Sequence, residues 1–141
     1  MSVDDSDTEG PDASGETYEL VDPDQADHQR SGKSETEHVD LTEKLDLAEM
    51  RARVWYMEPG HDRKGTHVHE RQEELYYAIE GPGRMTIAGE TIEVPEGAFV
   101  RLPPETPRRL FNDTDEEHVW LIVGAPPVRD DGHQLNRQQD R

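Results

Sequence analysis

Short stretches of continuous or alternating apolar residues recur along the chain from Arg51 to about residue 125. They are rich in β-branched and aromatic residues and too short for helices, so each one predicts a β-strand. Residues that favour turns, chiefly Gly, Pro, Asn and Asp, separate them. The stretches are RVWYME (53–58), THVHE (66–70), ELYYAIE (74–80), GRMTIA (83–88), ETIEV (90–94), AFVRL (98–102), RRLF (108–111) and HVWLIV (118–123).

This succession of strands predicts an all-β domain. No helical pattern of useful length interrupts it, so we expect an antiparallel sandwich or a closed barrel. The segment AGE (88–90) between two of the strands suits a tight hairpin. Ahead of the strands, HVDLTEKLDLAEM (38–50) predicts a short helical turn with Thr42 as a candidate N-cap.

The two ends of the chain differ in composition from the strand-rich part. The first 40 residues contain 13 Asp or Glu, two basic residues and almost no apolar periodicity. A segment of this kind buries too little apolar surface to offset the loss of chain entropy. We therefore predict a disordered acidic tail over residues 1–37, one barrel domain over 38–127 and a polar C-terminal tail over 128–141.

The charge of the chain limits its partners. The formal net charge is −18, from 33 acidic and 15 basic residues, which resembles the surfaces of proteins from extreme halophiles. In molar salt such carboxylates are screened over a Debye length of about 3 Å. The charge repels phosphate backbones and anionic lipids, so we expect no nucleic acid and no membrane as partner. Because only 30% of the residues are hydrophobic, the core is small, which favours a homodimer.

The absence of cysteine and the N-terminal sequence bear on the cellular location of the protein. The chain has no cysteine, which excludes disulfides and thiolate metal ligands. The N-terminal sequence MSVDDSDTEG has neither the basic start nor the apolar run of a signal peptide. No stretch approaches the 18 apolar residues of a membrane-spanning helix. We expect a cytoplasmic protein.

The stretch GTHVHERQEEL (65–75) concentrates the candidate metal ligands. His67 and His69 lie two residues apart on a predicted strand, so they project from the same face. Glu74 begins the next strand, which can return antiparallel beside the first, and Glu73 competes with it. If that face lines the barrel interior, two imidazoles and a carboxylate suit Fe(II), Mn, Ni, Co or Zn. The alternative is three surface polar groups in a chain with 34% charged residues.

The spacing of these residues forms the first of two patterns. Gly60 is followed by six residues, then His67 and His69 with one residue between them, four residues, Glu74, six residues and Gly81.

The second pattern starts at Gly97, which is followed by five residues and Pro103, with Glu105, Arg108 and Asn112 at fixed offsets. Over residues 50–125 the two patterns together resemble the two motifs of the cupin family. The resemblance implies a small single-domain jelly-roll barrel, in which His67, His69 and Glu74 hold a divalent transition metal.

Two positions depart from the family pattern. Glu105 stands where the family usually has glycine. A glutamate is unstrained there only if the turn avoids a positive φ. Arg108 stands where the family usually has a fourth ligand, a histidine. Arginine stays protonated and has no lone pair to donate, so it cannot coordinate a metal. Its guanidinium can instead bind the carboxylate or phosphate of a substrate, or it can pair with Glu74 or Glu105.

The resemblance leaves two functional hypotheses. The first is a metal-dependent enzyme acting on a small organic molecule, such as a dioxygenase, an isomerase or a decarboxylase, since the fold supports all of these. The second is a degenerate barrel that has lost its metal, because the cation of Arg108 lies beside the ion position. Such a barrel would bind a small molecule without turnover, or would be purely structural.

Overall fold

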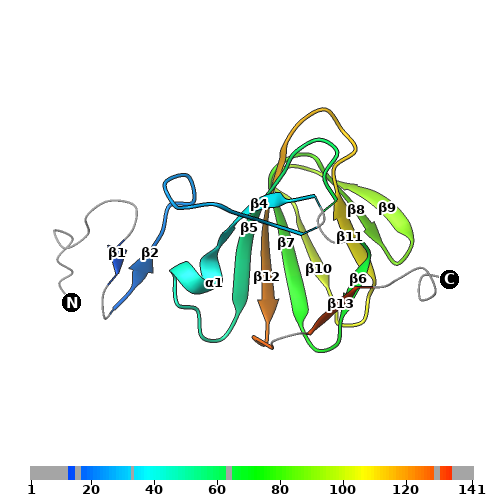
Figure 1. Cartoon of the computed structure of the whole chain (residues 1–141). Coiled ribbons are helices and arrows are strands. Elements are labelled where there is room, and N and C mark those ends of the chain that lie inside the picture. Colours follow the sequence, from blue (N-terminus) through cyan, green and yellow to red (C-terminus); the bar gives the residue numbers. More distant parts are fainter. Residues whose placement is uncertain (1–12, 15–16, 33, 63–64, 129–130, 135–141) are drawn as a thin grey trace.

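Two antiparallel sheets face each other in the computed structural model, which describes residues 13–14, 17–32, 34–62, 65–128 and 131–134 (Figure 1). The first sheet has six strands in the spatial order β10 (Phe99–Leu102), β7 (Glu73–Glu80), β12 (His118–Ala125), β5 (Arg51–Met57), β4 (Thr36–Asp40) and β3 (Gln29–Ser31). The second sheet has five, in the order β13 (Gly132–Gln134), β6 (His67–His69), β11 (Arg108–Phe111), β8 (Gly83–Ile87) and β9 (Glu90–Val94). The predicted all-β antiparallel sandwich is confirmed.

Each of the eight stretches predicted from the sequence forms a strand, β5 to β12 in chain order. The AGE hairpin is also confirmed, because β8 and β9 pair from Ile87 and Glu90 onward. Its two central residues, Ala88 and Gly89, have φ of 49° and 86°. Positive φ at both positions is the conformation of the turns that match the right-handed twist of a hairpin.

The short helix α1 (Leu41–Lys44) forms where it was predicted, but its N-cap is Asp40 and the choice of Thr42 was wrong. The Asp40 side chain accepts a hydrogen bond from the Glu43 amide at 3.4 Å. The Thr42 hydroxyl is used elsewhere, since it accepts from the Ala52 amide at 2.8 Å and donates to the Ala52 carbonyl at 3.2 Å. Thr42 therefore ties the helix to the start of β5.

Both ends of the described chain extend the β-structure beyond the predicted boundaries of residues 38 and 127. β4 begins at Thr36, and β3 pairs with it at the edge of the first sheet. β1 (Ala13–Ser14) and β2 (Glu19–Leu20) form a separate two-stranded sheet that stands beside the barrel (Figure 1). β13 lies within the segment predicted as a polar tail. Main-chain pairing at a sheet edge needs few apolar side chains, so composition did not reveal these strands. Residues 1–12 lie outside the described part of the chain.

The core lies between the sheets and leaves one end of the barrel polar. Its buried side chains are Trp55, Met57, Tyr76, Ala78, Met85, Val94, Leu102, Leu110, Trp120 and Ile122. On β5, Trp55 and Met57 face this core, and Arg51 and Arg53 continue the same face toward the start of the strand. A smaller cluster of Val39, Val54 and Val119 lies on the outer side of the first sheet.

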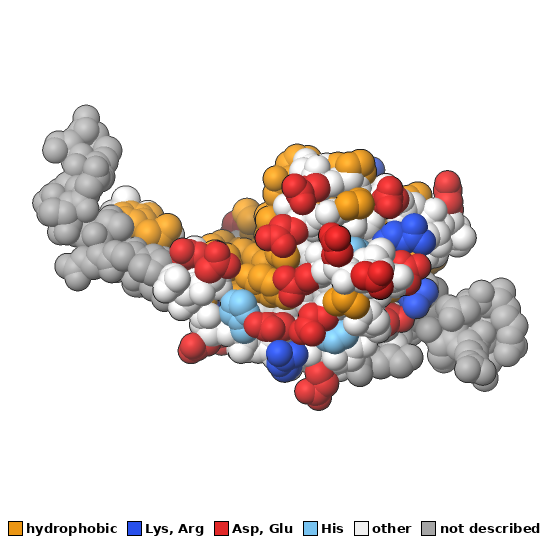
Figure 2. Space-filling view, turned by 90° about the horizontal axis from the view of Figure 1, so that it is seen from above, with side chains coloured by type: hydrophobic (Ala, Val, Ile, Leu, Met, Phe, Trp, Pro, Cys, Tyr) orange, Lys and Arg blue, Asp and Glu red, His pale blue; other side chains and the backbone are white. Residues whose placement is uncertain are grey.

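The surface carries the acidic character of the sequence. Figure 2 shows Asp and Glu side chains spread over the face in view, with few Lys and Arg between them. Among the residues that the structure describes, no helix combines the length and the apolar character needed to cross a membrane.

Gly83 supplies a test of the core. A Cβ atom at this position would lie 2.2 Å from Cζ2 of Trp120, which is fully buried. We expect Gly83→Ala to lower the free energy of unfolding by about 2 kcal/mol, because the indole cannot move without opening the core. Denaturant unfolding in high salt, followed by tryptophan fluorescence, measures the change.

The matched control for Gly83 is Gly89→Asn in the hairpin turn. No atom lies within 4 Å of the added Cβ there, and asparagine tolerates the positive φ. We expect this change to cost about 1 kcal/mol, the strain of a Cβ at this φ, and so less than Gly83→Ala. Equal unfolding midpoints for the two variants would contradict the close packing of Gly83 on Trp120.

Candidate metal centre

The three predicted metal ligands converge inside the barrel. His67 and His69 project from β6 and Glu74 from β7, and the residues are 2%, 7% and 5% exposed. One ligand atom of each lies within 4.8 Å of those of the other two. The imidazole ring centroids are 5.4 Å apart. The alternative of three surface polar groups is wrong, because all three side chains are buried.

The two oxygens of the Glu74 carboxylate have different surroundings. Oε1 accepts a hydrogen bond from the Tyr76 hydroxyl at 2.8 Å and another from Nη1 of Arg108 at 2.6 Å. Oε2 lies 3.2 Å from Nε2 of His69. The carboxylate is thus anchored through one oxygen, and its other oxygen faces the imidazole.

His69 lies between two carboxylates. Its Nε2 faces Glu74, and its Nδ1 lies 3.4 Å from Oδ2 of Asp131. Neither ring nitrogen makes a hydrogen bond to any residue that the structure describes. Leaving a buried polar atom without a partner is unfavourable. A metal ion on Nε2, with Nδ1–H directed toward Asp131, would satisfy both nitrogens and fix the tautomer. The donor set therefore fits a divalent metal.

Asp131 is a residue of the site that the sequence did not reveal. Its carboxylate accepts hydrogen bonds from the amides of Arg71 at 3.0 Å and Gln72 at 2.8 Å. Burial disfavours its charge, but these amides and the adjacent His69 together lower the pKa of Asp131 below its ordinary value. Asp131 reaches the site because β13 pairs with β6, where Gly132 lies opposite His69. That pairing left no pattern in the polar sequence DDGHQL.

Arg108 supports Glu74 in the structure. The residue is fully buried and lies opposite His67 in the pairing of β11 with β6. Besides Glu74, its guanidinium donates to the carbonyls of Thr106 at 2.8 Å and Pro103 at 3.0 Å. Of the two roles considered for Arg108, the structure shows the ion pair, with Glu74 as the partner. A role in binding a substrate anion stays a prediction.

The turn before Arg108 has a positive φ, the conformation that glycine favours. Glu105 has a φ of 69°, and its amide donates to the His69 carbonyl at 2.6 Å. The turn therefore does not avoid a positive φ. The side chain is exposed, so packing does not compensate for the conformation, which costs about 1 kcal/mol for a residue with a Cβ.

Glu73 does not compete with Glu74 for the site. It points outward from β7 and forms an exposed ion pair with Arg101. The six-residue step from Glu74 to Gly81 thus identified the inward-facing carboxylate.

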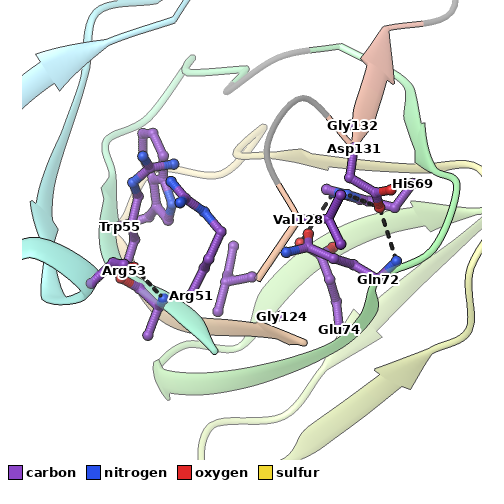
Figure 3. Close-up of a pocket in the computed structure, with 13 residues that line it drawn as sticks. Arg51, Arg53, Trp55, His69, Gln72, Glu74, Gly124, Val128, Asp131 and Gly132 are labelled. Atoms are coloured by element: carbon purple, nitrogen blue, oxygen red, sulfur yellow. Dashed lines mark hydrogen bonds and ion pairs between the residues drawn. The ribbon is translucent and has the colours of Figure 1, made fainter. Parts of the chain in front are cut away.

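A cavity of about 510 Å³ adjoins two of the three ligands, His69 and Glu74 (Figure 3). His69, Glu74 and Asp131 line one side of it. Arg51 and Arg53 of β5 line the opposite side, and Figure 3 shows them across the opening from His69 and Glu74. The volume is in the range of small-molecule sites.

Comparisons with known proteins agree with this fold. The sequence matches the family described as "Cupin domain" over residues 53–124. It is 44% identical over 61 residues to the uncharacterized protein MJ1618 of Methanocaldococcus jannaschii, a match that covers 43% of this chain and 49% of that protein. The chain thus spans about half the length of this curated relative.

Two solved structures show the same fold at low sequence identity. A cupin protein from Bacteroides fragilis gives a TM-score of 0.60 at 22% identity and covers 83% of this chain and 97% of that chain. A sugar phosphate isomerase from a cupin superfamily of Silicibacter pomeroyi gives a TM-score of 0.63 at 19% identity and covers 72% of each chain.

The pair of Glu74 and Arg108 can be tested against its exposed neighbour. We expect Arg108→Met to lower the free energy of unfolding by about 3 kcal/mol, because it leaves a buried carboxylate without its cation. Arg101→Met breaks the exposed pair with Glu73 and should cost less than about 1 kcal/mol. Denaturant unfolding at fixed salt measures both.

The added change Glu74→Gln removes the orphaned charge, so it should recover part of the stability lost in Arg108→Met. No recovery in the double variant, or equal costs at Arg108 and Arg101, would contradict the buried pair.

Glu105 offers a second stability test. We expect Glu105→Gly to raise the free energy of unfolding by about 0.5 kcal/mol, because relief of the positive φ exceeds the extra entropy of glycine in the unfolded chain. Glu105→Val should lower it, because a β-branched side chain is more strained at this φ. Thermal unfolding of both variants gives the sign, and a destabilised glycine variant would argue against strain in this turn.

Proposed function

The chain belongs to the cupin domain family, and from this we propose that it binds a divalent metal through His67, His69 and Glu74. We also propose that a small organic molecule binds in the adjoining cavity. The observation that carries the proposal is the buried convergence of two imidazoles and a carboxylate beside a cavity of about 510 Å³.

The residues around the ligands support this assignment. Tyr76 and Arg108 hold one oxygen of Glu74, so the carboxylate keeps its orientation. Asp131 faces Nδ1 of His69 and favours the tautomer that leaves Nε2 free to coordinate. Two nitrogen donors and one carboxylate suit Fe(II), Mn, Ni, Co or Zn, and ligand type does not choose among them.

The proposed chemistry divides between the ion and the chain. When bound, a divalent ion supplies Lewis acidity toward an oxygen of the small molecule. The chain positions that molecule. Trp55 of β5 and Ile122 of β12 line the cavity with apolar side chains against which it can pack. Dioxygenase, isomerase and decarboxylase activities are all compatible with this arrangement, because the fold alone does not select a reaction.

One observation favours a second candidate, a barrel that binds its small molecule without a metal. Nη1 of Arg108 lies 2.6 Å from Oε1 of Glu74 and already compensates the buried carboxylate. A cation at this position also repels a metal ion. The two candidates share the cavity and differ only in the ion.

A homodimer is part of the proposal. Leu75, Ile79 and Phe99 are exposed on the outer face of β7 and β10, and Phe99 stacks on Tyr77 at a centroid distance of 4.5 Å. These side chains form an apolar surface that a second copy of the chain would cover.

Metal content decides between the two candidates. We expect the protein, purified in high salt or loaded with Fe(II), Mn, Ni, Co or Zn, to retain about one ion per chain after buffer exchange. His67→Ala and Glu74→Ala each remove one of three ligands and should reduce the retained metal at least tenfold. Elemental analysis of the folded proteins gives the stoichiometry.

The control for metal retention is His133→Ala. His133 belongs to β13 in the same sheet but is half exposed and pairs with Glu70, outside the ligand group. Its metal content should equal that of the parent. A parent that stays empty after loading with every metal would replace the metal proposal with the metal-free binder.

A further inference from the structure

Two arginines line the side of the cavity that faces the metal ligands. Arg51 and Arg53 lie two residues apart on β5, on the same face as the core residues Trp55 and Met57. Ala52 between them is buried on the other face of the strand. The two arginines therefore point into the open end of the barrel, and both line the cavity (Figure 3).

The strand pairing places these cations at a defined position relative to Glu74. Gly124 of β12 lies opposite Arg51 on one side and opposite Glu74 on the other. Adjacent strands are about 4.8 Å apart, so roughly 10 Å separates the backbones of Arg51 and Glu74. The residue between them is a glycine, and the buried Gln72 side chain packs over it, 3.2 Å from where a Cβ on Gly124 would lie. Two residues further along β5, Arg53 is paired with Ile122 of β12, which is paired in turn with Tyr76 of β7.

The arginines have few anionic partners. In the described part of the chain no ion pair is found for Arg51, and the carboxylate nearest Arg53 is that of Asp40, at 3.8 Å. Nε of Arg53 is buried and has no hydrogen-bond acceptor among the described residues. The chain has 33 acidic residues for 15 basic ones, yet among the described residues only Asp40 lies within ion-pair distance of either arginine.

We propose that Arg51 and Arg53 bind the oxyanion of a small organic ligand, a carboxylate or a phosphate group. The planar guanidinium donates two parallel hydrogen bonds to such a group. The rest of the ligand extends through the cavity past the Gln72 side chain, which covers Gly124, toward His69 and Glu74. This names the ligand class for the proposed function and rests on it, and it assigns to β5 the anion-binding role that the sequence suggested for Arg108.

Direct binding of simple oxyanions tests the assignment. The probes are inorganic phosphate and malonate, titrated calorimetrically into the full chain at fixed chloride, after any metal has been removed with a chelator and the chelator has been dialysed away. We expect Arg51→Gln and Arg53→Gln each to weaken binding of the preferred probe about tenfold, the loss of one charge-assisted contact. The probe that binds more tightly distinguishes a phosphate from a carboxylate ligand.

Two further variants make the outcome decisive. Arg101→Gln removes an exposed arginine of β10 outside the cavity and should leave binding unchanged. Arg51→Lys retains the charge and should recover part of the affinity, which a variant that merely misfolds would not do. Unchanged affinity in Arg51→Gln and Arg53→Gln, or no saturable binding of either probe by the parent, would overturn the proposal.

The titration also separates this inference from the metal proposal. Arg51→Gln should retain the metal content of the parent, because Arg51 is not a ligand. Oxyanion binding that persists in a parent shown to hold no metal would leave the arginine site standing and remove only the ion. A parent that holds metal but binds no oxyanion would support the metal proposal and overturn the arginine site.

Discussion

The site depends on one buried negative charge, the carboxylate of Glu74. A carboxylate in this position is stable only if its charge is compensated and its oxygens are hydrogen-bonded. Arg108 and Tyr76 meet both needs at Oε1, and this leaves Oε2 directed at His69. The arginine that replaces the usual fourth ligand therefore has a structural role, because it fixes the carboxylate that the two imidazoles face.

The turn at Glu105 adopts a conformation typical of glycine although a glutamate occupies it. Its positive φ lets the Glu105 amide reach the His69 carbonyl, and three residues later Arg108 enters the second sheet. A glycine would adopt this conformation without strain. Glutamate stands here in place of the glycine of the family pattern, and the backbone still adopts the positive φ that glycine favours.

Local patterns predicted the strands and the ligand group, and long-range pairing decided the rest. Alternation within each stretch was enough to locate β5 to β12, and motif spacing was enough to identify Glu74 over Glu73. Asp131 joins the site only because β13 pairs with β6 across some 60 residues of sequence. The sequence alone gives no sign that Arg51 and Arg53 share a cavity with the ligand group. Their place in the cavity follows from the pairing of β5 with β12, which no local pattern encodes.

The close approach of Gly132 to His69 has a consequence for the end of the chain. A Cβ on Gly132 would lie 3.0 Å from Cε1 of the imidazole, so the backbone of β13 rests against the ring. The docking of β13 and the position of His69 are therefore thermodynamically linked. Fixing the imidazole therefore stabilises the docked position of residues 131–134. By reciprocity, docking of this segment stabilises the position of the imidazole by the same free energy.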